Sequence, residues 1–221
     1  MKCIEKIDIA EYPLCDADFW INICYLLERE RVFKCFNKIL FADAVWHELK
    51  GKSFSNKEKF KNAYVEYINE INKNRAYNLV LSEDVFIDSK QRLLIEKLLV
   101  EHNIRYDKRN KCYEKGQKDL GEKVSIIYAT VLSLKILLSD DNGSKEFRSK
   151  SNIRKRIGRQ VDVFSTGSFL RRAGLEENEV GKLLDKLYDG EKLLETKNIK
   201  DETKKESFLD AKNRLISSGK L

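Results

Sequence analysis

The chain has 221 residues, of which 42% are hydrophobic and 36% charged, and its formal net charge is +7. This length and composition predict an ordinary globular fold with a heavily charged surface, built as one domain or as one domain with an added helical piece. No stretch approaches the roughly 18 consecutive apolar residues of a membrane span. The N-terminus does not resemble a secretory signal, so we expect a cytoplasmic protein that does not contact membranes.

The cysteines favour a reducing compartment. There are five, an odd number, and none forms a C-x-x-C pair. Cys15, Cys24 and Cys35 stand inside apolar patterns, where a reduced cysteine acts as a small hydrophobe, and we expect them to fill the core. Only two histidines are present, and neither has a partner at zinc-ligand spacing, which argues against a zinc site.

Hydrophobic periodicity predicts strands and helices that alternate along the chain. In the first part of the chain we expect a strand within 4–15, a helix from 21 toward 33, a helix or turn that follows 39–46 and ends near Gly51, and a helix at 60–71. A strand at 77–81 and a helix with a leucine stripe at 93–99, capped by Ser82 or Asp84, come next. The last part should contain a helix at 124–132, strands at 135–138 and 161–164, and helices at 183–187 and 208–216. Such alternation is typical of an α/β fold with a parallel sheet covered by helices, in which functional groups gather at the carboxyl ends of the strands.

Acidic residues stand at the boundaries between these elements. They follow the first strand, lie in the segment 45–49, open the helix at 124–132 and close the strand at 135–138; in chain order they are Asp16, Asp18, Glu48, Asp119, Glu122, Asp140 and Asp141. Carboxylates that share a site repel one another, and a hard cation such as Mg²⁺ relieves this repulsion. The pattern therefore predicts a magnesium site able to activate water against a phosphodiester.

Each acid also has an ordinary structural explanation. Asp16 and Asp18 fit a turn after Pro13, and Glu48 fits the surface of a helix. The segment 119–122 fits a capping box, and 140–143 fits a turn after a strand. The prediction of a metal site therefore depends on the joint placement of the acids and not on any one of them.

Two basic clusters flank the acids, at 105–115 and 145–159. Phosphate neutralisation supplies most non-specific affinity for nucleic acid, so the clusters favour a nucleic-acid partner over two solvated loops. Tyr106 and Tyr113 lie within the first cluster. Simple packing is the more common role for tyrosines beside a basic loop, and stacking on the bases of single-stranded RNA is the alternative. The residues that we expect to bind the RNA backbone are Lys145, Arg148, Arg154, Lys155, Arg156 and Arg159.

Short motifs in a fixed order resemble the PIN-domain ribonuclease family, in particular bacterial PIN proteins of the toxin–antitoxin type. The segments that carry the resemblance are DADFWI at 16–21, AVWHEL at 44–49, LGE at 120–122 with IIYA at 126–129, LLSDD at 137–141, STGSFL at 165–170 and AGL at 173–175. The position of the hydroxyl residue Ser139 favours Asp141 over Asp140. Asp18, Ser165 and Ser168 depart from the family pattern.

The resemblance implies a three-layer α/β/α fold with a central parallel sheet of four or five strands. A nuclease domain would span 1–175, with a helical insertion at about 52–117, and a helical extension at 176–221 would pack on the core. The resemblance also implies an endoribonuclease dependent on Mg²⁺, with Mn²⁺ as the alternative metal, that leaves a 3′-hydroxyl and a 5′-phosphate. A toxin or defence role, a protein antitoxin or inhibitor, and a homodimer are further implications.

The resemblance assigns three tiers of site residues. The metal ligands and catalytic acids would be Asp16, Glu48, Glu122 and Asp141. Second-tier acids are Asp18, Asp119 and Asp140. Residues that orient water or the carboxylates from a second layer would be Asn22, Ser139 and Thr166.

Three alternatives stay open at this point. The first is a PIN-fold protein without catalysis that binds nucleic acid or assembles with other subunits. The second is a structure-specific DNA nuclease, because such enzymes use similar acid clusters. The third, a response-regulator-like domain, lacks a lysine clearly placed on a later strand and leaves Glu48 and Glu122 unexplained.

Overall fold

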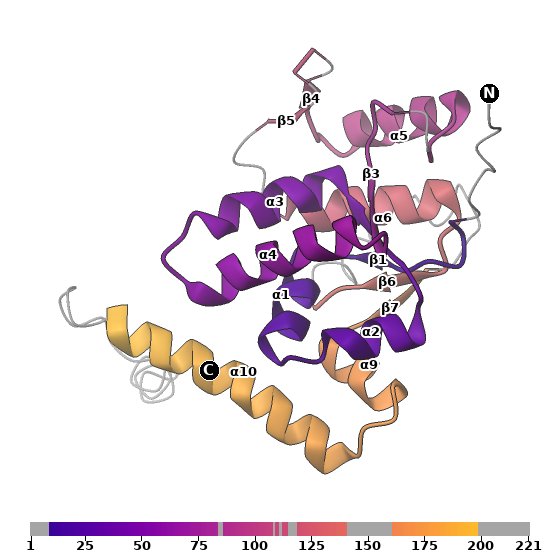
Figure 1. Ribbon diagram of the computed structural model, residues 1–221. Helices are drawn as coiled ribbons and strands as arrows, with labels where there is room; N and C mark the ends of the chain where they lie inside the picture. The colour runs from indigo at the N-terminus through magenta and orange to yellow at the C-terminus, as the bar shows by residue number, and fades with distance from the viewer. Residues whose placement is uncertain are drawn as a thin grey trace, which may run out of the picture. The chain divides into compact units, whose positions relative to one another are not determined.

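The computed structural model describes residues 9–83, 86–107, 109–110, 112–114, 119–140 and 161–198. Figure 1 shows the arrangement of its helices and strands. In chain order the elements are β1 (Leu14–Cys15), α1 (Ala17–Tyr25), α2 (Arg29–Cys35), β2 (Ile39–Ala42), α3 (Asp43–Ser53), α4 (Glu58–Asn72), β3 (Ala76–Leu79), α5 (Ser89–Glu101), β4 (Tyr106–Asp107), β5 (Cys112–Tyr113), α6 (Leu120–Leu132), β6 (Ile136–Leu138), β7 (Asp162–Phe164), α9 (Thr166–Arg172) and α10 (Glu177–Asn198).

The central sheet has five parallel strands in the order β3-β2-β1-β6-β7. The chain first builds outward from β1 to β3, and then returns to the other side of β1 with β6. Leu14 pairs with Leu40 on one side and with Leu137 on the other. This reversal of strand order creates a switch point between β1 and β6, and in open parallel sheets the crevice outside the carboxyl ends at such a point holds the functional groups.

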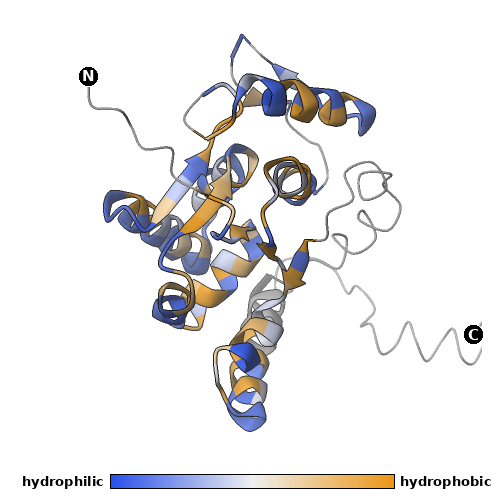
Figure 2. Ribbon diagram, turned by 90° about the vertical axis from the view of Figure 1, so that its right-hand side faces the viewer, coloured by the Kyte–Doolittle hydropathy of each residue, from blue (hydrophilic) through white to orange (hydrophobic). Residues whose placement is uncertain are grey.

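Helices cover both faces of the sheet. The helix α6 packs against β1, β2 and β6, and α5 packs on α6. On the other face, α1 and α4 pack on each other, and Phe41 of β2 makes edge-to-face contacts with Trp20 at 5.4 Å and with Tyr67 at 5.1 Å. Figure 2 shows apolar residues concentrated on the strands and on the helix surfaces that face them. All four residues of β2 are buried, as expected for a strand covered on both faces.

The predicted fold class is confirmed: the protein is α/β with an all-parallel, helix-covered sheet of five strands, consistent with a PIN-like three-layer arrangement. Three local predictions were wrong. The helix expected from 21 toward 33 is two helices, separated where Leu27 adopts a positive φ of 63°. Asp88 caps α5 through a capping box with Gln91, in place of Ser82 or Asp84. Cys35 is exposed and does not fill the core, whereas Cys15 is buried.

The chain divides into two compact units, Met1–Val180 and Gly181–Leu221. The first contains the sheet and the helices from α1 to α9. In the second, α10 continues to Asn198, which agrees with the helix predicted at 183–187, while the helix predicted at 208–216 lies outside the described residues. Within the part of the chain that the structure describes, no helix combines the length and the apolar character needed to cross a bilayer.

Candidate active site

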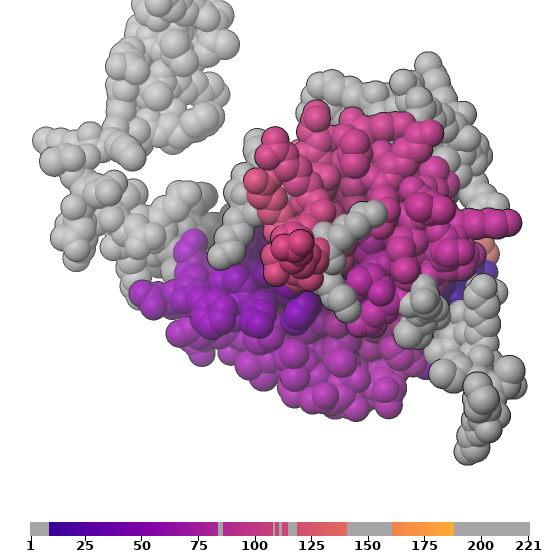
Figure 3. Space-filling model, turned by 90° about the horizontal axis from the view of Figure 1, so that it is seen from above, coloured from indigo at the N-terminus to yellow at the C-terminus, as the bar shows by residue number. Residues whose placement is uncertain are grey.

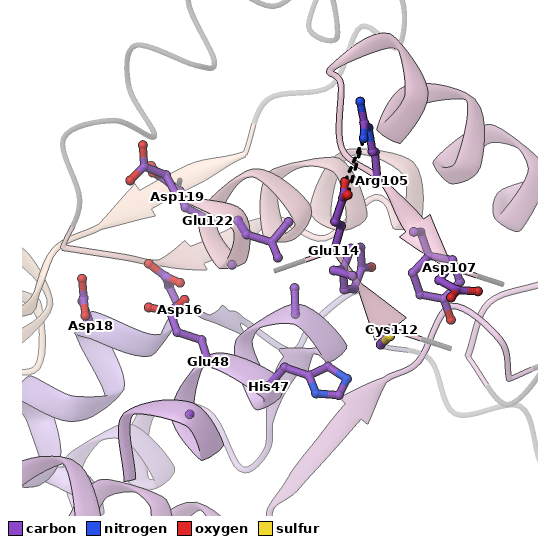
Figure 4. Close-up of a pocket in the computed structure, with 16 residues that line it drawn as sticks. Asp16, Asp18, His47, Glu48, Arg105, Asp107, Cys112, Glu114, Asp119 and Glu122 are labelled. Carbon is purple, nitrogen blue, oxygen red and sulfur yellow. Dashed lines mark hydrogen bonds and ion pairs between the residues drawn. The ribbon is translucent and has the colours of Figure 1, made fainter. Parts of the chain in front are cut away.

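The carboxyl edge of the sheet opens into a pocket of about 980 Å³. Because α6 precedes β6 and runs back along the sheet, its first turn lies at this same edge. The predicted acids that line the pocket are Asp16, Asp18, Glu48, Asp119 and Glu122. Figure 4 shows these side chains on one side of the pocket, with the segment 105–114 on the other. The structure thus brings together acids that lie as much as 106 positions apart in the chain, from Asp16 to Glu122.

Asp16 is fixed at the switch point by the sheet itself. Its backbone N–H donates a hydrogen bond to the carbonyl of Leu138 at 2.9 Å, which extends the pairing of β1 with β6 by one residue. The hydroxyl of Ser139 donates to its carboxylate at 3.2 Å. The Asp16 side chain is buried, with 4% of the residue exposed. Burial, and then the nearby charge of Glu48, raise the pKa of Asp16 to about 7.

Gly121 allows the carboxylates of Asp16 and Glu48 to approach the start of α6. A Cβ atom at Gly121 would lie 2.5 Å from Oε2 of Glu48 and 3.5 Å from Oδ1 of Asp16. Both carboxylates therefore lie against the same point of the helix backbone, and one of them occupies the space that any other residue would fill. The glycine of the LGE motif is explained by this close approach and not by a special backbone dihedral.

Lys52 neutralises the outer part of the acid group. It lies one helical turn after Glu48 on α3, and its Nζ is 2.7 Å from Oε1 of Glu48 and 2.6 Å from Oδ1 of Asp18. Burial alone would lower the pKa of Lys52, but the two carboxylates outweigh this effect and raise it above its ordinary value. The ammonium group therefore stays charged and bridges two of the acids that the sequence assigned to the site.

Asp140 does not line this pocket and is held by hydrogen bonds. Its Oδ1 accepts from the backbone N–H of Thr166 at 2.6 Å, and its Oδ2 accepts from the Asn22 side chain at 3.0 Å and from the Thr166 hydroxyl. These contacts join α1, β6 and α9 at the carboxyl edge. Asn22 and Thr166 thus contact a second-tier acid, whereas Ser139 contacts Asp16.

Several predicted residues lie outside the described part of the chain. They are Asp141 and the basic residues Lys145, Arg148, Arg154, Lys155, Arg156 and Arg159. Asp119 opens α6 but makes no capping hydrogen bond through its side chain, so the capping-box alternative for 119–122 is not what the structure has.

A buried polar group beside the pocket was missed in the sequence. Asp43, the first residue of α3, is buried, and its carboxylate accepts hydrogen bonds from the Tyr113 hydroxyl at 2.9 Å and the Tyr128 hydroxyl at 3.1 Å. Burial raises the pKa of Asp43 above its ordinary value. Tyr113 was a candidate for stacking on a base, with simple packing as the more common role, and the structure has it packed: it is 7% exposed and its hydroxyl donates to Asp43. Of the two tyrosines, only Tyr106 retains partial exposure.

The donor set can be tested against Mg²⁺. Among the residues that the structure describes, no three His, Cys, Asp or Glu side chains come close enough together to hold a metal ion. Mg²⁺, however, is commonly held by one or two carboxylates that leave its other positions to water and substrate phosphate. Asp16 and Glu48 supply such a pair, all donors in the group are hard oxygens, and their mutual repulsion favours a cation. The pair fits Mg²⁺ on these grounds.

Comparison of the sequence with protein-family models finds no match, and comparison with curated proteins finds none either.

Proposed function

We propose that the protein is a metal-dependent endoribonuclease whose Mg²⁺ is held by Asp16 and Glu48, with Glu122 and Asp141 as further ligands. The observation that carries the proposal is the meeting of a buried Asp16 with Glu48 at Gly121, at the switch point of a parallel sheet. A buried carboxylate whose pKa is raised by burial and by a second carboxylate in the same pocket is costly to a fold, and such groups are typical of sites that bind hard cations.

The protein's own residues have separable tasks in this proposal. The Ser139 hydroxyl donates a hydrogen bond to Oδ2 of Asp16 and restricts rotation of this carboxylate. The other oxygen, Oδ1, is thereby held in one orientation for the metal. Glu122 enters the pocket from the first turn of α6. The basic residues at 145–159 bind the RNA backbone without reading its sequence. When bound, the metal supplies Lewis acidity and an activated water for hydrolysis of the phosphodiester.

The direct test compares cleavage by the wild type and by Asp16→Asn, using end-labelled RNA and DNA oligonucleotides with Mg²⁺. We expect Asp16→Asn to lose roughly 100-fold or more in rate, because the amide removes one negative charge from the metal site at constant shape. Asp88→Asn is the matched control, since asparagine also caps helices well and Asp88 lies in the capping box of α5. Equal RNA cleavage by all three proteins would overturn the proposal, whereas a preference for DNA would identify a DNA nuclease.

A second candidate function, a PIN-like protein that binds nucleic acid without cleaving it, is favoured by one observation. Lys52 already places a positive charge between Asp18 and Glu48, so part of the acid group is neutralised without a metal. An internal cation of this kind can serve as a structural replacement for a bound ion.

Lys52→Met separates the two candidates. If the site binds metal, removal of the competing ammonium should strengthen Mn²⁺ binding roughly tenfold, while the metal-free protein loses about 1 kcal/mol of stability or less, because the ion pairs are partly exposed. Lys50→Met, an exposed lysine on the same helix, is the control. Calorimetric titration with Mn²⁺ measures the effect. If neither the wild type nor Lys52→Met releases or absorbs heat on addition of Mn²⁺, the non-catalytic candidate is favoured.

The biological setting remains a prediction from the resemblance. We propose a cytoplasmic toxin or defence effector, with a protein antitoxin or a second copy of the chain as its partner.

A further inference from the structure

The wall of the pocket opposite the acids is a small antiparallel hairpin. It is made of β4 and β5, with Tyr106 paired to Tyr113 and Asp107 paired to Cys112. Its residues that line the pocket are Arg105, Tyr106, Asp107, Cys112, Tyr113 and Glu114. In Figure 3 the rose surface of this region borders the violet surface of α3, and Figure 4 shows it facing the carboxylates across the pocket.

One side chain anchors the hairpin to the body of the protein. Tyr113 is buried, whereas Tyr106 and Cys112 are partly exposed and Asp107 and Glu114 are exposed. The Tyr113 ring packs edge-to-face against Tyr106, with centroids 5.0 Å apart, and its hydroxyl donates to Asp43 at 2.9 Å. A two-stranded hairpin is barely stable by itself in water, so a buried anchor of this kind determines where the hairpin lies.

Asp43 is itself rigidly held. Its carboxylate also accepts hydrogen bonds from the backbone N–H groups of Ala44 at 2.9 Å and Leu81 at 3.1 Å. Tyr128 of α6 contacts the same carboxylate and lies 3.0 Å from the Tyr113 hydroxyl. The network therefore links the hairpin to α3 and α6, which both line the acid pocket, and to the segment after β3.

The two walls differ in chemistry. The wall with Asp16, Asp18, Glu48, Asp119 and Glu122 is acidic, whereas the described hairpin residues bring to the pocket the partly exposed ring of Tyr106 and the guanidinium of Arg105, which is 3.3 Å from the carboxylate of Glu114. An aromatic ring beside an arginine can stack on an unpaired base, which a single strand offers and a duplex does not. The pocket volume of about 980 Å³ is of the size that encloses a small ligand, which suits a short segment of single strand.

We infer that Asp43 is a positioning residue: through Tyr113 it holds the β4–β5 hairpin as the wall against which a single-stranded nucleic acid lies in the pocket. The inference rests on the proposed function and names the substrate class of the same site. It assigns substrate binding, and not metal binding, to the Asp43 network, because the network touches the hairpin and none of the acids assigned to the metal.

The network contains its own control. Tyr113→Phe and Tyr128→Phe each remove one hydroxyl group from the same carboxylate, but only Tyr113 lies on the hairpin. A purely structural network predicts similar losses of stability and no difference in nucleic-acid binding between the two variants. A positioning role predicts a difference, and phenylalanine keeps the packing of each ring, so both variants should fold.

The experiment measures binding of a fluorescent single-stranded RNA by anisotropy in EDTA, which prevents metal-dependent cleavage, together with hydrogen exchange across 105–114. We expect Tyr113→Phe to weaken RNA binding about tenfold and to speed exchange in the hairpin, while Tyr128→Phe binds RNA like the wild type. In cleavage assays Tyr113→Phe should raise KM with little change in kcat, and its affinity for Mn²⁺ should equal that of the wild type.

Two results would overturn the inference: equal RNA binding by Tyr113→Phe and the wild type, or equal weakening by the two phenylalanine variants. Failure of the proposed function gives a different result. A wild type that binds RNA but cleaves neither RNA nor DNA would refute the nuclease proposal, and the comparison of the two variants by binding and exchange would still decide the role of Asp43.

Discussion

In the absence of divalent cations, Asp16→Asn should be more stable than the wild type at about pH 8.5, and this advantage should be roughly 3 kcal/mol smaller at about pH 5. In the folded protein, burial and the charge of Glu48 raise the pKa of Asp16 to about 7 from an ordinary value of 3.8. The folded state therefore binds the Asp16 proton more tightly than the unfolded state does. Stability falls as the pH rises between these two values, and the full cost at higher pH is about 4 kcal/mol.

Thermal unfolding in EDTA at the two pH values measures this effect, with Asp88→Asn as the control. Adding Mg²⁺ at the higher pH should raise the Tm of the wild type, because the cation binds the folded state and compensates the ionised carboxylates. The same addition should have little effect on Asp16→Asn. A wild type that loses no stability relative to Asp16→Asn as the pH rises would show that Asp16 is not under electrostatic strain.

Gly121→Ala should fold normally and lose most of its cleavage activity. The new methyl group would lie 2.5 Å from Oε2 of Glu48, which is the far end of a flexible side chain, so Glu48 can move away at small cost to the fold. The displaced carboxylate would then no longer meet Asp16, and misplacement of a metal ligand typically costs about 100-fold in activity or metal affinity.

Gly51→Ala is the matched control for this substitution. Gly51 lies on α3 beside the same pocket, and an added Cβ there meets nothing within 4 Å. Alanine in place of a helical glycine stabilises by about 0.5–1 kcal/mol, so this variant should have a higher Tm and unchanged cleavage. Full activity in Gly121→Ala would mean that the position of Glu48 against α6 has no part in catalysis.

The sequence was sufficient to predict a parallel sheet covered by helices and most of the acids at its edge, because these follow from local patterns. Alternation of short strands with helices implies parallel pairing, and parallel pairing places the residues after β1 and before α6 at one edge. Asp16 and Glu122 follow from this pattern, whereas Glu48 was grouped with them through the segment 44–49 that resembles the PIN family, because the strand before α3 was not recognised. Lys52 stands four residues after Glu48, so its contact with that acid follows from helix geometry, whereas its contact with Asp18 depends on how α1 and α3 pack.

Asp43 shows why part of the candidate site was not predicted from the sequence. The run at 39–42 is a short apolar segment, which periodicity alone does not distinguish from part of a buried helix, and no strand was predicted there. The structure makes it β2, in the centre of the sheet. Acids that directly follow a parallel strand are candidate site residues, and Asp43 directly follows β2. Because β2 was not recognised as a strand, Asp43 was not selected. The partner Tyr113 is 70 positions away, on a hairpin whose polar residues give no strand pattern.

The central claim is that Asp16 and Glu48 bind one divalent cation together. Crystals of the full chain grown with Mn²⁺ and measured at the manganese absorption edge test it directly, because the anomalous signal locates the metal independently of any assay. We predict a peak within about 2.0–2.5 Å of carboxylate oxygens from both residues, beside Gly121. Ordered Asp16 and Glu48 side chains with the peak elsewhere, or with Lys52 as their sole cationic neighbour, would contradict the claim.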